Sequence, residues 1–130
     1  MPTAVQASNP TQSLVYVVDD EEPLAEMLKD LLKLENYRAI AFFSAEEALD
    51  AIRSTGEYPQ LLLSDFLMSE MNGMELIEAV TSQKPDTKTI LISGNIAEVT
   101  LKFFKVQPDL FLHKPFTVTQ LVQAVKSLLG

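Results

Sequence analysis

Apolar residues gather in five short runs along the chain, separated by polar or turn-forming residues. The runs cover Leu14–Val18, Arg38–Phe43, Leu61–Asp65, Thr87–Ile92 and Leu110–Leu112. Runs of this length, bounded by turn signals, are typical of strands buried on both faces. The pattern therefore predicts five strands inside a folded core.

Between these runs, apolar residues recur at helical spacing. We expect helices at Pro23–Glu35, Ser44–Gly56, Asn72–Val80, 96–106 and Thr117–Leu129. Ser44 with Glu47, and Thr117 with Gln120, have the spacing of capping boxes, and Asn36 is a plausible helix stop. Polar and apolar residues segregate least clearly in the segment 96–106.

Strands and helices thus alternate along the whole chain. Parallel strands need crossover connections, usually helices, and these crossovers are right-handed. The alternation predicts an α/β fold, in which helices cover both faces of a doubly wound, five-stranded parallel sheet to form a three-layer sandwich. A length of 130 residues suits one domain, which we place at 14–130, after a flexible tail or linker at 1–13.

Composition excludes several classes of function. The net charge of −8 leaves no basic surface for direct nucleic-acid binding, and the absence of cysteine excludes disulfides and thiolate metal sites. No apolar run approaches the roughly 20 residues needed for membrane insertion. The first thirteen residues lack the basic start and apolar segment of a signal peptide, so we expect a cytoplasmic protein.

Polar side chains collect where the predicted strands end. In a parallel sheet all carboxyl ends lie on one edge, which places Asp19, Asp20, Asp65, Ser93 and Lys114 near one another. Clustered carboxylates repel unless a cation compensates, and Mg²⁺ prefers such oxygen ligands. Two simpler interpretations stay open for single residues: Asp65 could cap a turn, and the Asp19–Asp20 pair could favour a helix N-terminus.

Five motifs carry a family resemblance. They are Val17-Val18-Asp19-Asp20, Asp65-Phe66-Leu67-Met68, Met71-Asn72-Gly73, Ser93-Gly94 and Lys114-Pro115-Phe116. In this order and spacing, the chain from Leu14 to Gly130 resembles the receiver domain of two-component response regulators, of the chemotaxis-regulator type. The resemblance implies a flavodoxin-like (βα)5 fold and a role in signal transduction through a phosphorelay.

The resemblance also implies roles at the acidic edge. Asp65 is expected to be the phosphoacceptor, taking a phosphoryl group from a phosphohistidine on a histidine kinase or histidine phosphotransfer protein. Asp20, Asp65 and the backbone carbonyl of Leu67 are expected to bind Mg²⁺ directly, with Asp19 acting through water. The metal would offset the charge of the transferring group.

Other family positions complete the expected machinery. Lys114 would pair with Asp65 and later with a phosphate oxygen, and a cis peptide between Lys114 and Pro115 would direct the amine into the site. Ser93 would donate its hydroxyl to the phosphate. The protein would then catalyse its own phosphorylation and autodephosphorylation without being a turnover enzyme.

Phosphorylation adds negative charge and acceptor oxygens, which can draw Ser93 inward. The resemblance then makes Phe111 the switch aromatic, and the output face would comprise 96–106, Leu110–Phe111 and Thr117–Leu129. We expect a downstream protein to bind this face, and a phosphorylation-driven homodimer through it stays open. The alternative for Phe111 is an ordinary core aromatic.

The residues leave two other functions open. A Mg²⁺-dependent phosphatase with an Asp nucleophile usually has Asp-x-Asp at the first strand, whereas Asp19 and Asp20 are adjacent, and no insertion is long enough for a substrate cap. A pseudo-receiver that only binds partners would not need the full set of site residues. Ser69 and Gln107-Pro108 depart from the family pattern in two loops. Whether the chain acts alone or within a longer protein also stays open.

Overall fold

The computed structural model describes residues 12–94 and 104–130. Within them the chain forms five strands and four helices. In chain order these are β1 (Leu14–Val18), α1 (Glu22–Leu34), β2 (Arg38–Phe42), α2 (Ala45–Thr55), β3 (Leu61–Asp65), α3 (Gly73–Gln83), β4 (Lys88–Ser93), β5 (Leu110–His113) and α5 (Val118–Leu129). The expected alternation is confirmed from β1 to β4 and from β5 to α5, and no helix is described between β4 and β5.

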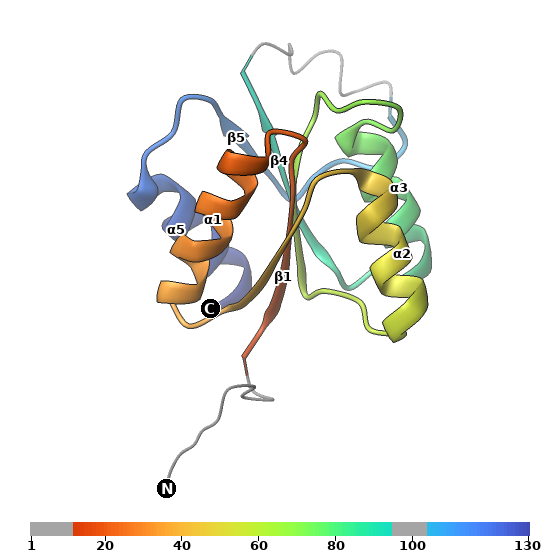
Figure 1. Ribbon diagram of the computed structural model, residues 1–130, viewed down its shortest axis with the longest axis horizontal. Coiled ribbons are helices and arrows are strands. Elements are labelled where there is room, and N and C mark those ends of the chain that lie inside the picture. The colour runs from red at the N-terminus through yellow and green to blue at the C-terminus, as the bar shows by residue number, and fades with distance from the viewer. Residues whose placement is uncertain (1–11, 95–103) are drawn as a thin grey trace, which may run out of the picture.

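All five strands join one parallel sheet in the order β2-β1-β3-β4-β5. Figure 1 shows α1 and α5 against one face and α2 and α3 against the other, which gives the expected three layers. None of the helices in the described part of the chain combines the length and apolar character needed to cross a bilayer.

The centre of the sheet explains why two strands lack polar alternation. All five residues of β1 are buried, as are all five of β3. Leu14, Tyr16 and Val18 pack into a core beneath α2 and α3, whereas Val15 and Val17 pack into a second core beneath α1 and α5. Because helices cover both faces, each side chain of β1 needs an apolar partner whichever way it points.

Local sequence signals set the helix boundaries. Asn36 and Gly56 adopt left-handed backbone conformations, each with φ of 71°, just beyond α1 and α2. This conformation ends a helix and is least costly for glycine and asparagine. Both residues therefore stop their helices as the sequence predicts.

The capping predictions have different outcomes. Thr117 and Gln120 form the expected reciprocal capping box at α5. At α2 the Ser44 side chain accepts a hydrogen bond from the Glu47 amide, but the Glu47 carboxylate accepts from the amide of Phe43, not that of Ser44. The α2 box is therefore not reciprocal, because Glu47 reaches one residue further back.

The helix expected at 96–106 is the least supported element. Residues 95–103 lie outside the described part of the chain, and residues 104–106 form bends, so the helical prediction is wrong for those three. The Gln107 side chain donates to the Phe104 carbonyl at 3.1 Å. Since Gln107 precedes Pro108, its backbone also disfavours the helical region.

The segment entering β5 is tied to its neighbour β4. Asp109 Oδ2 accepts a hydrogen bond from the amide of Thr89 at 2.8 Å, and the amide of Asp109 donates to Thr89 Oγ1 at 3.0 Å. Thr89 is buried, so these bonds satisfy polar groups that water does not reach. They fix the start of an edge strand that ends beside the acidic cluster.

Candidate functional site

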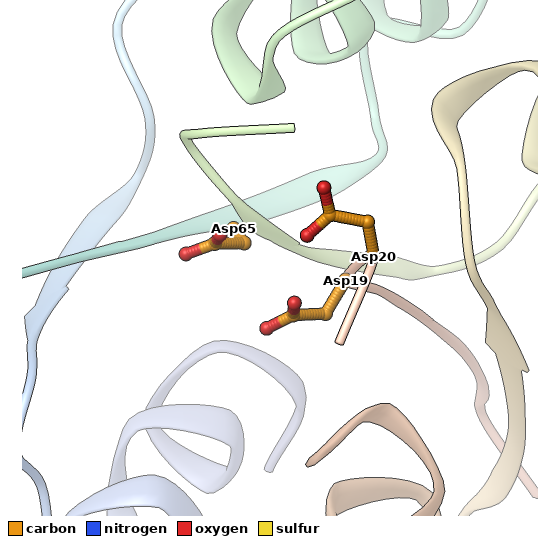
Figure 2. A group of neighbouring side chains, drawn as sticks. All are labelled: Asp19, Asp20 and Asp65. Atoms are coloured by element: carbon orange, nitrogen blue, oxygen red, sulfur yellow. The ribbon is translucent and has the colours of Figure 1, made fainter. Parts of the chain in front are cut away.

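Three carboxylates meet at the carboxyl edge of the sheet. Asp19 and Asp20 directly follow β1, and Asp65 is the last residue of β3. Each offers one oxygen such that the three oxygens lie within 4.8 Å of one another. Figure 2 shows their side chains extending from the two strand ends into the same space.

Asp19 is the most enclosed of the three. Its side chain is buried, and Oδ1 accepts a hydrogen bond from the Glu21 amide at 2.9 Å. Oδ2 is also buried but has no hydrogen-bond partner among the described residues. Burial, reinforced by the negative charge of Asp65, raises the pKa of Asp19 to about 6 despite the Glu21 amide and the more distant Lys114.

Lys114 supplies the cation at this edge. Its Nζ lies 3.1 Å from Asp65 Oδ1, and 3.8 Å from both Asp19 Oδ2 and Glu21 Oε1. Burial alone would lower the pKa of Lys114, but the hydrogen bond and charge of Asp65, with the charges of Asp19 and Glu21, raise it. Burial raises the pKa of Asp65, and Lys114 opposes that shift.

Ser93 and Lys114 are held together through the backbone. Ser93 ends β4 and is buried, and in the sheet register it lies opposite His113. The amide of Lys114 donates to the Ser93 carbonyl at 3.0 Å, and the Lys114–Pro115 peptide is cis. Phe111 is half-buried against the core beneath α2 and α3, and its ring centroid lies 4.3 Å from that of His113.

A cavity of about 290 Å³ opens over these groups. It is lined by Asp20, Glu21, Asp65, Leu67, Ser93, Gly94 and Lys114. Leu67 is 67% exposed, so its side chain forms an apolar part of the rim without closing it. A small anionic group can therefore reach Asp65 from solvent.

Two residues that shape this site, Glu21 and Gly73, have no functional role in the predictions from the sequence. Glu21 joins the Lys114 ion pairs, and only its position directly after Asp19-Asp20 could have indicated this. Gly73 packs so closely under β3 that a Cβ there would overlap the Asp65 carbonyl oxygen and lie 2.9 Å from Leu91 Cδ1. The Asn72-Gly73 pair was the available signal for that contact.

The donor set fits a hard divalent cation. It consists of carboxylate oxygens, and the Asp19 carboxylate has one oxygen, Oδ2, that is buried without a hydrogen bond among the described residues. One lysine cannot balance the charge of three clustered carboxylates together with Glu21. A cation such as Mg²⁺, which binds oxygen ligands and retains waters, would offset two of the remaining negative charges and supply a partner for the unpaired oxygen.

Comparisons with known proteins agree with this arrangement. The family model for the response regulator receiver domain matches residues 15–126. The transcriptional regulatory protein CpxR of Escherichia coli K12 is 29% identical over 116 residues, which are 88% of this chain and 48% of that relative. The chain thus spans about half the length of this curated relative.

Two solved structures show the same fold. A putative response regulator from Chloroflexus aurantiacus has a TM-score of 0.79 at 26% identity, covering 92% of this chain and 98% of the other. A CheY-like receiver domain protein from Methanospirillum hungatei has a TM-score of 0.81 at 25% identity, covering 90% and 93%. The family-model match covers most of the chain, and the protein therefore belongs to the response regulator receiver domain family.

Proposed function

We propose that Asp65 is the phosphoacceptor of this receiver domain, and that its donor is a phosphohistidine on a histidine kinase or phosphotransfer protein. The observation that carries the proposal is the contact of Asp65 with Lys114 inside a three-carboxylate cluster at an open cavity. Asp20, Asp65 and the Leu67 carbonyl would bind Mg²⁺, and Asp19 would act through water. A bound Mg²⁺ would offset negative charge on the phosphoryl group.

The chemistry needs positioning more than acid–base work. An Oδ atom of Asp65 attacks phosphorus, the P–N bond of the phosphohistidine breaks, and the departing nitrogen keeps the electron pair; the proton already on the other ring nitrogen leaves the histidine neutral. Lys114, already 3.1 Å from Asp65 Oδ1, then contacts a phosphate oxygen. Ser93, on the neighbouring strand end, donates its hydroxyl to another.

The same step can switch a distant surface. Movement of Ser93 toward the phosphate would be transmitted to β5, because the Lys114 amide is bonded to the Ser93 carbonyl. Phe111 is half-buried on that strand, so its side chain can move further into or out of the core. We assign output to the face that contains β5 and α5, where a downstream protein would bind. The aspartyl phosphate would be lost by autodephosphorylation, so the domain acts as a switch and not as a turnover enzyme.

Intact-mass measurement tests the proposal. Incubation with phosphoramidate and Mg²⁺ should add about 80 Da, one phosphoryl group, to the wild type but not to Asp65→Asn. Asp86→Asn is the matched control, since Asp86 is an exposed aspartate in the α3–β4 connection, and it should be modified like the wild type. An adduct that persists in Asp65→Asn would reject the assignment, and phosphate release without an adduct would indicate a phosphatase.

A further inference from the structure

Among the described residues that form ion pairs with Lys114, Glu21 is the one that lies mainly in solvent. Its side chain is 69% exposed, compared with 2% for Asp19 and 9% for Asp65. It also lines the cavity above Asp65. Glu21 therefore places a negative charge at the mouth of the site, while the other two Lys114 partners lie deeper.

The charge balance makes this position consequential. Asp19, Asp20, Glu21 and Asp65 together carry three more negative charges than Lys114 can offset. A divalent cation in the acidic cluster would still leave one negative charge, and removing Glu21 would bring the site to neutrality. Glu21 thus determines whether an incoming phosphodonor meets a neutral or a negative entrance.

The leaving group of the donor is the part that Glu21 meets. Attack by Asp65 is roughly in line with the bond that breaks, so the leaving group points away from Asp65 and toward the cavity mouth. The two ion-pair distances to Lys114 place Glu21 Oε1 within about 7 Å of Asp65 Oδ1. Two unit charges separated by that distance in water interact with an energy of order RT.

We infer that Glu21 is a specificity-determining residue that selects phosphodonors by the charge of their leaving group. This inference rests on the proposed phosphoacceptor function. Donors whose leaving group carries a proton on nitrogen and departs neutral are favoured, such as phosphoramidate, protonated at the breaking bond, or a phosphoimidazole, protonated at its other ring nitrogen. Donors that release an anionic oxygen, such as acetyl phosphate, are disfavoured.

The two donor reactions differ only in the leaving group. In both, an Asp65 oxygen bonds to phosphorus. With acetyl phosphate the P–O bond breaks and acetate departs as an anion past Glu21. With phosphoramidate the P–N bond breaks and the protonated nitrogen departs as ammonia, so no anion passes the carboxylate.

The test compares the rates at which acetyl phosphate and phosphoramidate form the Asp65 adduct, followed by intact mass at saturating Mg²⁺ for each variant. In Glu21→Gln the ratio of the acetyl phosphate rate to the phosphoramidate rate should rise about threefold over wild type. Added NaCl should raise the same ratio in the wild type, because salt screens exposed charges, but should have little effect on it in the variant.

Glu22→Gln is the matched control. Glu22 is the next residue, is exposed, and belongs to none of the Lys114 ion pairs in the described part of the chain. Its substitution should leave the donor ratio unchanged. Equal acceleration of both donors by Glu21→Gln, or the same ratio in both variants, would overturn the inference. No adduct from either donor in the wild type would overturn the proposed function itself.

Discussion

The buried carboxylate of Asp19 makes a quantitative prediction about the stability of the metal-free protein. Burial raises its pKa from 3.8 to about 6. Its folded-state pKa is therefore above the unfolded value, and the folded state binds the proton more tightly. The stability that protonated Asp19 contributes to the folded state is fully present below about pH 4 and is lost as the pH rises through about 6.

The magnitude follows from the same shift. A change of about two pKa units corresponds to about 3 kcal/mol between the ends of the window. Only about half of this, roughly 1–2 kcal/mol, separates pH 5 from pH 7.5, because pH 5 lies within the window. Asp19→Asn mimics the protonated carboxyl and can still accept from the Glu21 amide. The variant should therefore be more stable than wild type at pH 7.5.

Urea unfolding followed by circular dichroism, with EDTA present, measures this effect. The wild type should lose about 1–2 kcal/mol between pH 5 and pH 7.5, and Asp19→Asn should lose clearly less. Some dependence of the same sign should remain, because the pKa of Asp65 is also raised. Asp86→Asn, at an exposed site, should match the wild type. An unchanged pH dependence in Asp19→Asn would refute the assignment of the shift to this carboxyl.

Two further substitutions test how the backbone supports the site. Gly73→Ala should destabilise the protein by about 1–3 kcal/mol, because the added Cβ would overlap the Asp65 carbonyl oxygen. Gly94→Ala would make only an ordinary contact and should cost less than about 1 kcal/mol. Thermal unfolding compares the two variants, and equal losses of stability would contradict the predicted clash at Gly73. Asp109→Ala should cost about 1–3 kcal/mol, because the buried Thr89 amide loses its acceptor. Amide exchange at Thr89 should accelerate, and unchanged protection would show that the bond is dispensable.

The regular elements could be predicted from the sequence because their signals are local. The apolar runs of β1 and β3 have no polar alternation, and this pattern requires cover on both faces. Helix ends at Asn36 and Gly56 follow from residues that tolerate left-handed backbone. Once these elements alternate, the rules for parallel sheets place every strand end on one edge, and the candidate site follows.

The remaining features depend on contacts between distant segments. The approach of Gly73 to the Asp65 carbonyl arises from the packing of α3 under β3, and no residue pattern encodes that distance. The ion pair between Glu21 and Lys114 joins opposite ends of the chain. Residues 104–106 are not helical, because the weakly amphipathic pattern of this segment does not outweigh the local effects of Gln107 and Pro108.

The adjacency of Asp19 and Asp20 explains how one short turn gives two different environments. The Asp19 amide still donates to the Phe42 carbonyl at 3.1 Å, so this residue continues the line of β1 and its side chain enters the interior beside Lys114. Asp20 lies in the bend that follows β1, so its side chain is exposed at the cavity while its carboxylate still reaches the cluster. The adjacent pair therefore places one acid deep in the site, where its charge must be compensated, and one at the mouth, where a cation can exchange with solvent.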